Sequence, residues 1–199
     1  MPKVQFWKVF IFVDYTNLTM PKYLQAKPRK QITLQNIGEL VGDPGVEEWV
    51  KALVLYLYYY GVRISEALKV SRRDFNVFRR GKREYLQVSS ATLKNPTHEN
   101  RILYVPLNAP YLDTLLNYMD KRKDHIWDYT RQWSRVKIQQ YMPEASPHAF
   151  RHNRLNEFAQ AGETAYALKS WAGWSDTRPG EAYVQQVDTR AIADRFFRK

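Results

Sequence analysis

The stretch from Val46 to Tyr60 constrains the fold of this 199-residue chain more than any other segment. It follows a turn at Asp43-Pro44-Gly45, and Gly61 supplies a natural C-terminal stop. Apolar side chains recur between these signals at the 3.6-residue spacing of a helix: Val46, Trp49, Val50, Leu53, Val54 and Leu57. The pattern predicts a long helix, whose Tyr56, Tyr58, Tyr59 and Tyr60 we expect in the core or on the helix surface rather than stacked on bases.

The rest of the chain predicts an α+β fold, mainly α, with a small three-stranded antiparallel sheet inserted early. β-branched and aromatic residues predict strands over 75–78, 84–89 and 102–106, with a tight turn over 79–82. Further helices are expected over 33–40, 63–68, 147–161, 164–171, 180–187 and 189–198. Two amphipathic faces are expected in addition, one with Leu112, Leu115, Leu116 and Met119, the other with Trp133, Val136 and Tyr141.

The chain divides near residue 30. Residues 1–30 begin apolar and aromatic and become basic toward Pro28-Arg29-Lys30, which predicts a short helix followed by a linker. Residues 31–199 form the main body. Apolar residues make up 44% of the chain and aromatic residues 15%, so a packed core can offset the entropy cost of ordering.

Charge and cysteine content limit which partners and which kinds of site the chain can have. The formal net charge of +11 favours a polyanionic partner, most commonly nucleic acid, although a merely basic protein would carry the same charge. No cysteine is present, which excludes disulfides and thiolate metal sites, and the four histidines lack the spacing of a zinc site. No apolar run reaches the roughly 20 residues that span a bilayer. We therefore expect no membrane partner and a cytoplasmic location.

Several residues suit phosphodiester chemistry. Ser146-Pro147 predicts a capped helix start, with His148 and Arg151 one turn apart near its positive end. An arginine grips two phosphate oxygens, and a histidine exchanges protons near neutral pH. Arg63 follows the predicted stop at Gly61, and Glu66 lies where an i,i+3 pair would orient an arginine. The alternatives are an incidental His and Arg on a capped surface helix, and an ordinary surface ion pair worth little.

Three further residues are weaker signals by themselves. Lys94 lies between two predicted strands, where it would reach into a groove or simply be solvated. Trp174 follows Gly173 and offers one N–H donor, although an indole at a helix end usually packs. Tyr183 comes nine residues after Trp174 and is one of 14 tyrosines.

Together these residues resemble the catalytic domain of the tyrosine recombinase (phage integrase) family, including its archaeal, viral and Xer-like members. The family pattern is an arginine in Gly-x-Arg-x-Ser-Glu, a hairpin lysine, His-x-x-Arg, Leu-Gly-His or its Trp variant, and a tyrosine nine residues on. Matching residues occur in that order over about 31–199: Gly61 to Glu66, Lys94, His148 to Arg151, Ala172-Gly173-Trp174 and Tyr183. Trp174 replaces the usual histidine, and residues 1–30 match only the last helix and linker of the family's core-binding domain, so a catalytic fragment or short form is expected.

The resemblance implies a role for each matched residue. Tyr183 would attack a phosphodiester of duplex DNA and form a 3′-phosphotyrosyl link. Arg63 and Arg151 would hold the non-bridging oxygens, Lys94 would protonate the leaving 5′ oxygen, His148 would help deprotonate Tyr183, and Trp174 would donate a hydrogen bond. Glu66 would support Arg63. No metal, cofactor or ATP is implied.

Double-stranded DNA is accordingly the expected partner. The family also implies a homo-oligomer, a tetramer on DNA, joined through the C-terminal tail with Ile192, Phe196 and Phe197, unless that tail packs on its own domain. We expect a site-specific recombinase or integrase, for instance in viral genome integration. The alternatives are a type IB topoisomerase-like strand transferase and a DNA-binding module of the same fold without activity.

Overall fold

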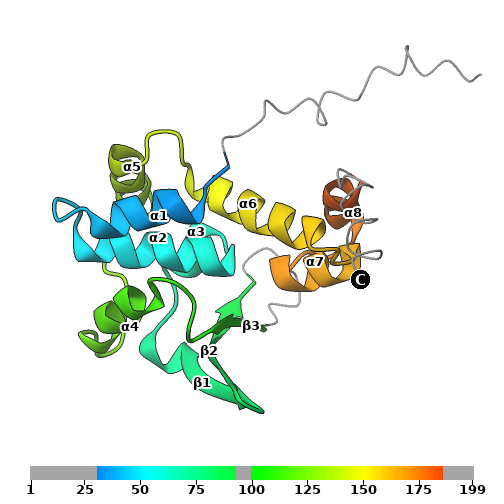
Figure 1. The fold of residues 1–199 in the computed structure, drawn as a ribbon, viewed down its shortest axis with the longest axis horizontal. Coiled ribbons are helices and arrows are strands. Elements are labelled where there is room, and N and C mark those ends of the chain that lie inside the picture. The colour runs from blue at the N-terminus through cyan, green and yellow to red at the C-terminus, as the bar shows by residue number, and fades with distance from the viewer. Residues whose placement is uncertain (1–30, 93–99, 186–199) are drawn as a thin grey trace, which may run out of the picture.

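The computed structural model describes residues 31–92 and 100–185 (Figure 1). The helices are α1 Leu34–Gly42, α2 Glu48–Tyr60, α3 Ile64–Ala67, α4 Leu112–Asp120, α5 Arg131–Tyr141, α6 Pro147–Gln160, α7 Ala165–Ala172 and α8 Arg178–Val184, with a 3₁₀ turn over Arg72–Asp74. The strands are β1 Phe75–Arg80, β2 Arg83–Ala91 and β3 Asn100–Pro106. The predicted fold class, mainly helical with a three-stranded antiparallel sheet, is confirmed.

Helix α2 is the centre of the core. Nearly all of its side chains are buried, including the four tyrosines, as the sequence predicts. Helices α1, α4, α5 and α6 pack around it. The helix ends at Gly61 in the left-handed conformation (φ 59°), where a Cβ atom would lie 2.9 Å from Cβ of Arg154. This close approach lets α6 pass against the end of α2, next to Arg63.

The sheet has the order β1-β2-β3, and its strands are longer than predicted. The predicted turn over 79–82 is too long, because Arg79 and Arg80 still pair with Glu84 and Arg83. The connection shrinks to Gly81-Lys82, with Gly81 at φ 58°. Two-residue hairpin connections need this positive φ, which explains the longer strands.

The apolar face predicted for α5 is partly wrong. Trp133 and Val136 are about half exposed, whereas Ser134 and Ile138 are fully buried. The Trp133 ring lies beneath the Lys137 ammonium at 5.3 Å instead of entering the core. Trp133 and Val136 therefore lie on the solvent side of α5, whereas Tyr141, the third residue of the predicted face, does pack against the core.

Helices α6, α7 and α8 form the end of the fold that carries the tyrosine. In Figure 1, α6 runs from the α1–α2 pair toward α7 and α8. A small separate core joins α6 to α7 through Leu155, Ala159, Leu168 and Ala172. Helix α8 begins two residues before its predicted start, and the predicted helix over 189–198 lies outside the described residues. None of the helices within the described ranges is long and apolar enough to span a bilayer.

Candidate active site

Glu66 is the residue around which the candidate active site is built. Arg63 caps the start of α3, and its backbone N–H and its Nη1 both donate to Glu66, at 3.0 and 2.7 Å. Glu66 is 2% exposed, so the predicted i,i+3 pair is present but is not the surface pair that the alternative interpretation required. Arg63 remains partly exposed, with 22% of its side-chain surface accessible. Glu66 thus fixes an arginine that still reaches solvent.

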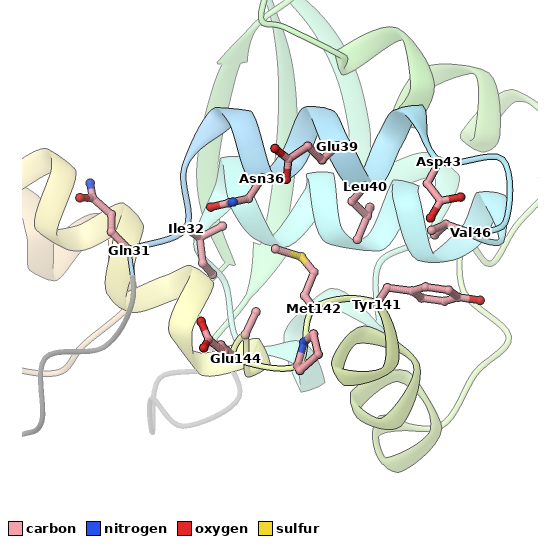
Figure 2. Close-up of a pocket in the computed structure, with 12 residues that line it drawn as sticks. Gln31, Ile32, Asn36, Glu39, Leu40, Asp43, Val46, Tyr141, Met142 and Glu144 are labelled. Carbon is pink, nitrogen blue, oxygen red and sulfur yellow. The ribbon is translucent and has the colours of Figure 1, made fainter.

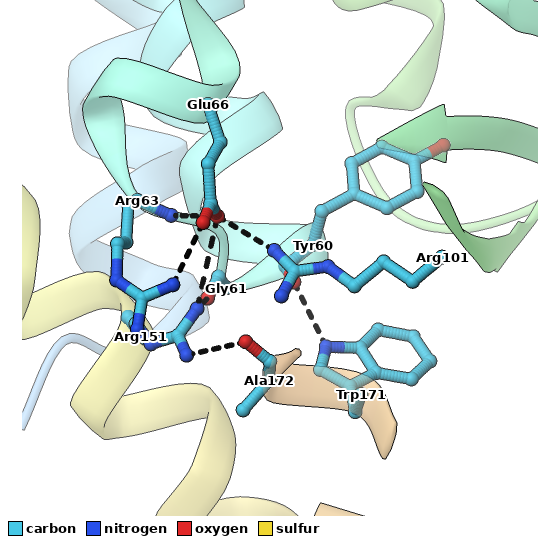
Figure 3. Close-up of polar contacts among 8 residues, drawn as sticks. All are labelled: Tyr60, Gly61, Arg63, Glu66, Arg101, Arg151, Trp171 and Ala172. Atoms are coloured by element: carbon cyan, nitrogen blue, oxygen red, sulfur yellow. Dashed lines mark hydrogen bonds and ion pairs between the residues drawn. The ribbon is translucent and has the colours of Figure 1, made fainter. Parts of the chain in front are cut away.

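Arg101, which sequence reasoning missed, completes the site from β3. Its Nη2 donates to Oε2 of Glu66 at 2.7 Å, and both side chains are buried (Figure 3). A signal was available in the strand pattern, because Arg101 alternates with the buried Leu103 and Val105 and so lies on the inward face of β3. An arginine at an inward strand position needs a buried acidic partner.

Arg151 approaches the same carboxylate from α6. The predicted cap is confirmed, with Ser146 Oγ accepting from Ala149 N–H and Pro147 in the first turn. Arg151 is 2% exposed and donates to the carbonyl oxygens of Gly61 and Ala172 at 3.3 and 2.6 Å, and its Nη1 lies 4.0 Å from Glu66. Burial, together with repulsion from Arg63 and Arg101, lowers the pKa of Arg151 to about 10. The guanidinium therefore still carries its charge at neutral pH.

These contacts leave an excess of positive charge. Three guanidinium groups from α3, β3 and α6 converge on one buried carboxylate, so two positive charges have no acidic partner in the cluster. Burial raises the pKa of Glu66, but the charge of Arg101 and the hydrogen bonds from Arg63 outweigh it, so the net pKa lies below 4.5. A charged carboxylate and two unbalanced cations make a site that favours an anion.

Trp174 connects this cluster to Tyr183. The guanidinium carbon of Arg151 lies 5.6 Å from the Trp174 ring, and the Tyr183 ring stacks on Trp174 with centroids 5.9 Å apart. The structure therefore brings four predicted residues into one neighbourhood: Arg63, Arg151, Trp174 and Tyr183. Trp174 packs between the arginine and the tyrosine, so its packing and its proposed chemistry are compatible.

The histidine ring that packs on Tyr183 is that of His152, whereas the family motif assigns His148 to this tyrosine. His148 is exposed at the start of α6, and its ring lies 6.3 Å from that of His152. The His152 ring contacts the Tyr183 ring edge-to-face at 5.0 Å. His152 follows His148 by one helical turn, but the family motif assigns it no role, so the sequence alone does not identify it as a site residue. In the described part of the chain, no three His, Asp or Glu side chains are close enough to hold a metal ion.

Lys94 and the C-terminal tail lie outside the described residues. The residues that flank the Lys94 segment lie at the site, however. A Cβ atom on Gly173 would be 2.5 Å from both Cγ2 of Thr92 and Nη1 of Arg101, so the base of the β2–β3 connection lies against the residue preceding Trp174. The hairpin expected to carry the lysine therefore starts and ends beside the arginine cluster.

A cavity of about 420 Å³ lies elsewhere, between α1 and the α5–α6 connection (Figure 2). Leu40, Asp43, Tyr141 and Met142 are among its lining residues, and none of the arginine cluster is. This cavity is therefore separate from the candidate active site.

No protein-family model and no curated protein matches the chain. Solved structures do match. The XerH site-specific recombinase bound to difH substrate has a TM-score of 0.61 at 12% identity, over 83% of this chain and 51% of that chain. The catalytic domain of bacteriophage HP1 integrase has a TM-score of 0.60 at 16% identity, over 84% of this chain and 94% of that chain. The Tn1549 transposon integrase in complex with circular intermediate DNA has a TM-score of 0.57 at 17% identity, over 86% of this chain and 66% of that chain.

The chain has the fold of a tyrosine recombinase catalytic domain. The resemblance stated from the sequence motifs is thus confirmed at the level of the fold. The HP1 integrase structure matches over nearly its whole length, whereas this chain spans only about half of the XerH chain.

Proposed function

We propose that this chain is the catalytic domain of a site-specific DNA recombinase or integrase that cleaves and rejoins duplex DNA through a 3′-phosphotyrosyl intermediate. The observation that carries the proposal is the cluster of Arg63, Arg101 and Arg151 on one buried carboxylate, linked to Tyr183 through Trp174. A phosphodiester supplies the anion that such a cluster lacks. The net charge of +11 suits a DNA partner at longer range.

In the proposed cleavage step, the Tyr183 oxygen attacks phosphorus and the bond from phosphorus to the 5′ oxygen breaks. Arg63 and Arg151 bind the non-bridging oxygens and stabilise the added negative charge of the transition state. Lys94 gives a proton to the leaving 5′ oxygen, and Trp174 donates its N–H to the phosphate. Attack by a 5′-hydroxyl on the phosphotyrosine reverses the step, so rejoining needs no ATP.

Two histidines are candidates to accept the Tyr183 proton. His148 holds the position that the family motif assigns to this task, whereas His152 is the histidine whose ring packs on Tyr183 at 5.0 Å. Imidazole titrates near neutral pH, so either group suits the step. Comparing His148→Gln with His152→Gln in the cleavage assay assigns it, since the variant of the accepting histidine loses the larger share of cleavage rate.

The proposal is tested by covalent capture on DNA. The full chain is incubated with randomly nicked genomic DNA of its source, denatured, and the protein-linked ends are sequenced, so no target site need be known. We expect a 3′-linked adduct with wild type, no adduct with Tyr183→Phe, and an unchanged adduct with Tyr166→Phe, a 74% exposed tyrosine on α7. An adduct that survives Tyr183→Phe would overturn the assignment of the nucleophile.

The same experiment separates the alternatives. DNA binding without any adduct from wild type would favour a module without activity. Relaxation of supercoiled DNA without joining of two sites would favour a type IB topoisomerase-like enzyme. Cleavage is expected to persist in EDTA, and strict dependence on a divalent cation would contradict the proposed mechanism.

A further inference from the structure

Arg101 has no part in the proposed chemistry, yet its contact to the central carboxylate is as short as that of Arg63. It is the second residue of β3, and its Nη2 reaches Oε2 of Glu66 at 2.7 Å. The side chain of Arg101 is 7% exposed and that of Glu66 is fully buried. The contact therefore joins the sheet to the helix that carries Arg63.

Two arginines compete for the same oxygen of Glu66. Oε2 accepts from Arg101 at 2.7 Å, while Nη1 of Arg151 lies 4.0 Å from it (Figure 3). With Oε2 occupied by Arg101, Arg151 donates instead to the carbonyl oxygens of Gly61 and Ala172. Without Arg101, Oε2 would keep only the Arg63 backbone N–H, and Coulomb attraction would draw Arg151 toward that oxygen. Arg101 thus keeps Arg151 from being neutralised within the protein.

The guanidinium atoms of Arg101 that do not contact Glu66 face the Gly173-Trp174 segment rather than the solvent. Its Nε and Nη1 are buried and have no hydrogen-bond partner within the described residues. Nη1 packs against Gly173, where a Cβ atom would approach it to 2.5 Å. Nη2 is committed to Glu66, and Nε and Nη1 are enclosed on the side of the Gly173 segment. Any effect of Arg101 on the reaction must therefore act through Glu66 and through the Gly173-Trp174 segment.

We propose that Arg101 is a positioning residue for strand cleavage, which holds the Glu66 carboxylate on Arg63 and leaves Arg151 free to bind the phosphate. This inference rests on the proposed recombinase function. It assigns to β3 the task of setting the spacing of the two phosphate-binding arginines. A residue that only stabilised the fold would not change how cleavage depends on pH.

The pH profile follows from the contact. The charge of Arg101 is the largest influence lowering the pKa of Glu66, against burial, which raises it. Without that charge, Glu66 becomes protonated at a higher pH and releases Arg63. An opposite charge at this distance lowers a carboxyl pKa by roughly 1–3 units. The acid limb set by Glu66, which lies below that of the histidine that accepts the Tyr183 proton, should therefore move upward by about that amount.

The experiment compares Arg101→Gln and Arg101→Lys in the adduct assay between pH 4 and 8. Glutamine keeps a donor but loses the charge, so its acid limb should shift upward by roughly 1–3 pH units. Lysine keeps the charge, so its limb should stay at the wild-type position. Arg79→Met, which removes an exposed ion pair on β1, is the control and should leave the limb unchanged.

A direct titration keeps the test independent of catalysis. The pKa of the Glu66 side chain is followed by NMR of the carboxyl carbon in wild type and in the two Arg101 variants, after circular dichroism has verified folding. A raised pKa in Arg101→Gln and an unchanged one in Arg101→Lys support the proposal. An acid limb and a Glu66 pKa equal to wild type in a folded Arg101→Gln overturn it. Absence of any wild-type adduct would instead refute the recombinase proposal, while the titration would still report on Arg101.

Discussion

Replacing Glu66 by glutamine removes the single negative charge that three arginines share. Glu66 accepts from Arg63 N–H, Arg63 Nη1 and Arg101 Nη2, all at 3.0 Å or less. Removing one partner of a buried ion pair costs about 3–5 kcal/mol. Glutamine keeps one acceptor oxygen, and a neutral hydrogen bond restores about 1 kcal/mol. We therefore expect the free energy of unfolding to fall by roughly 2–4 kcal/mol.

The measurement is urea unfolding at pH 7, followed by circular dichroism. The matched control is Asp120→Asn, because Arg72 and Asp120 lie at the same 2.7 Å distance but with 43% and 64% of their side-chain surfaces exposed. An exposed pair is worth about 0–1 kcal/mol. The two variants thus differ in burial rather than in contact distance, and the denaturant slope should stay the same in both.

Equal losses of stability in Glu66→Gln and Asp120→Asn would refute the reasoning. That result would mean that water reaches the arginine cluster and screens it as it screens a surface pair. The unbalanced charge of the cluster would then be weakened by solvent, and the main physical reason to expect a bound phosphate there would disappear.

Three further predictions concern the surroundings of the cluster. Gly173→Ala should lower the free energy of unfolding by about 1–3 kcal/mol in thermal unfolding, because Gly173 has φ 65° and an added Cβ would clash with Arg101 and Thr92. The control is Gly42→Ala, whose added Cβ meets no neighbour and should not destabilise the protein. Trp171→Phe should cost about 1 kcal/mol in the same assay, because Trp171 Nε1 donates to Tyr60 O at 2.8 Å, and the exposed Trp133→Phe should cost less. The contribution of Glu66 should be complete above pH 4.5 and be lost as the pH falls through its lower folded pKa; urea midpoints of wild type and Glu66→Gln between pH 3 and 7 should therefore converge at the acid end.

The sequence predicts the local features of this fold well, because they depend on near neighbours. Helix periodicity and the stop at Gly61 identify α2, and Ser146 caps α6 through its side-chain oxygen as expected. The i,i+3 pair of Arg63 and Glu66 also forms as predicted. Each of these features is decided within one or two helical turns.

Features that depend on distant segments were predicted less well. The burial of Glu66 and its bond to Arg101 join residues 35 positions apart, and no local pattern specifies that pairing. The incorrect prediction of the buried face of α5 has a similar cause, since Ile138 and not Trp133 packs in the core. The catalytic roles of all the matched site residues stay predictions, and Lys94 and the tail residues lie outside the described part of the chain.

The distribution of the core suggests how the site divides into a fixed part and a more adaptable part. Arg63, Glu66 and Arg151 adjoin the main core, which is centred on α2. Trp174 and Tyr183 pack against a second core, which has four buried residues within the described part of the chain. Segments with few buried apolar contacts open locally at lower free energy than the main core. The arginines proposed to bind phosphate are thus held beside the main core, while Tyr183, the proposed nucleophile, packs on the smaller core, where it can adjust to DNA without disturbing the arginine cluster.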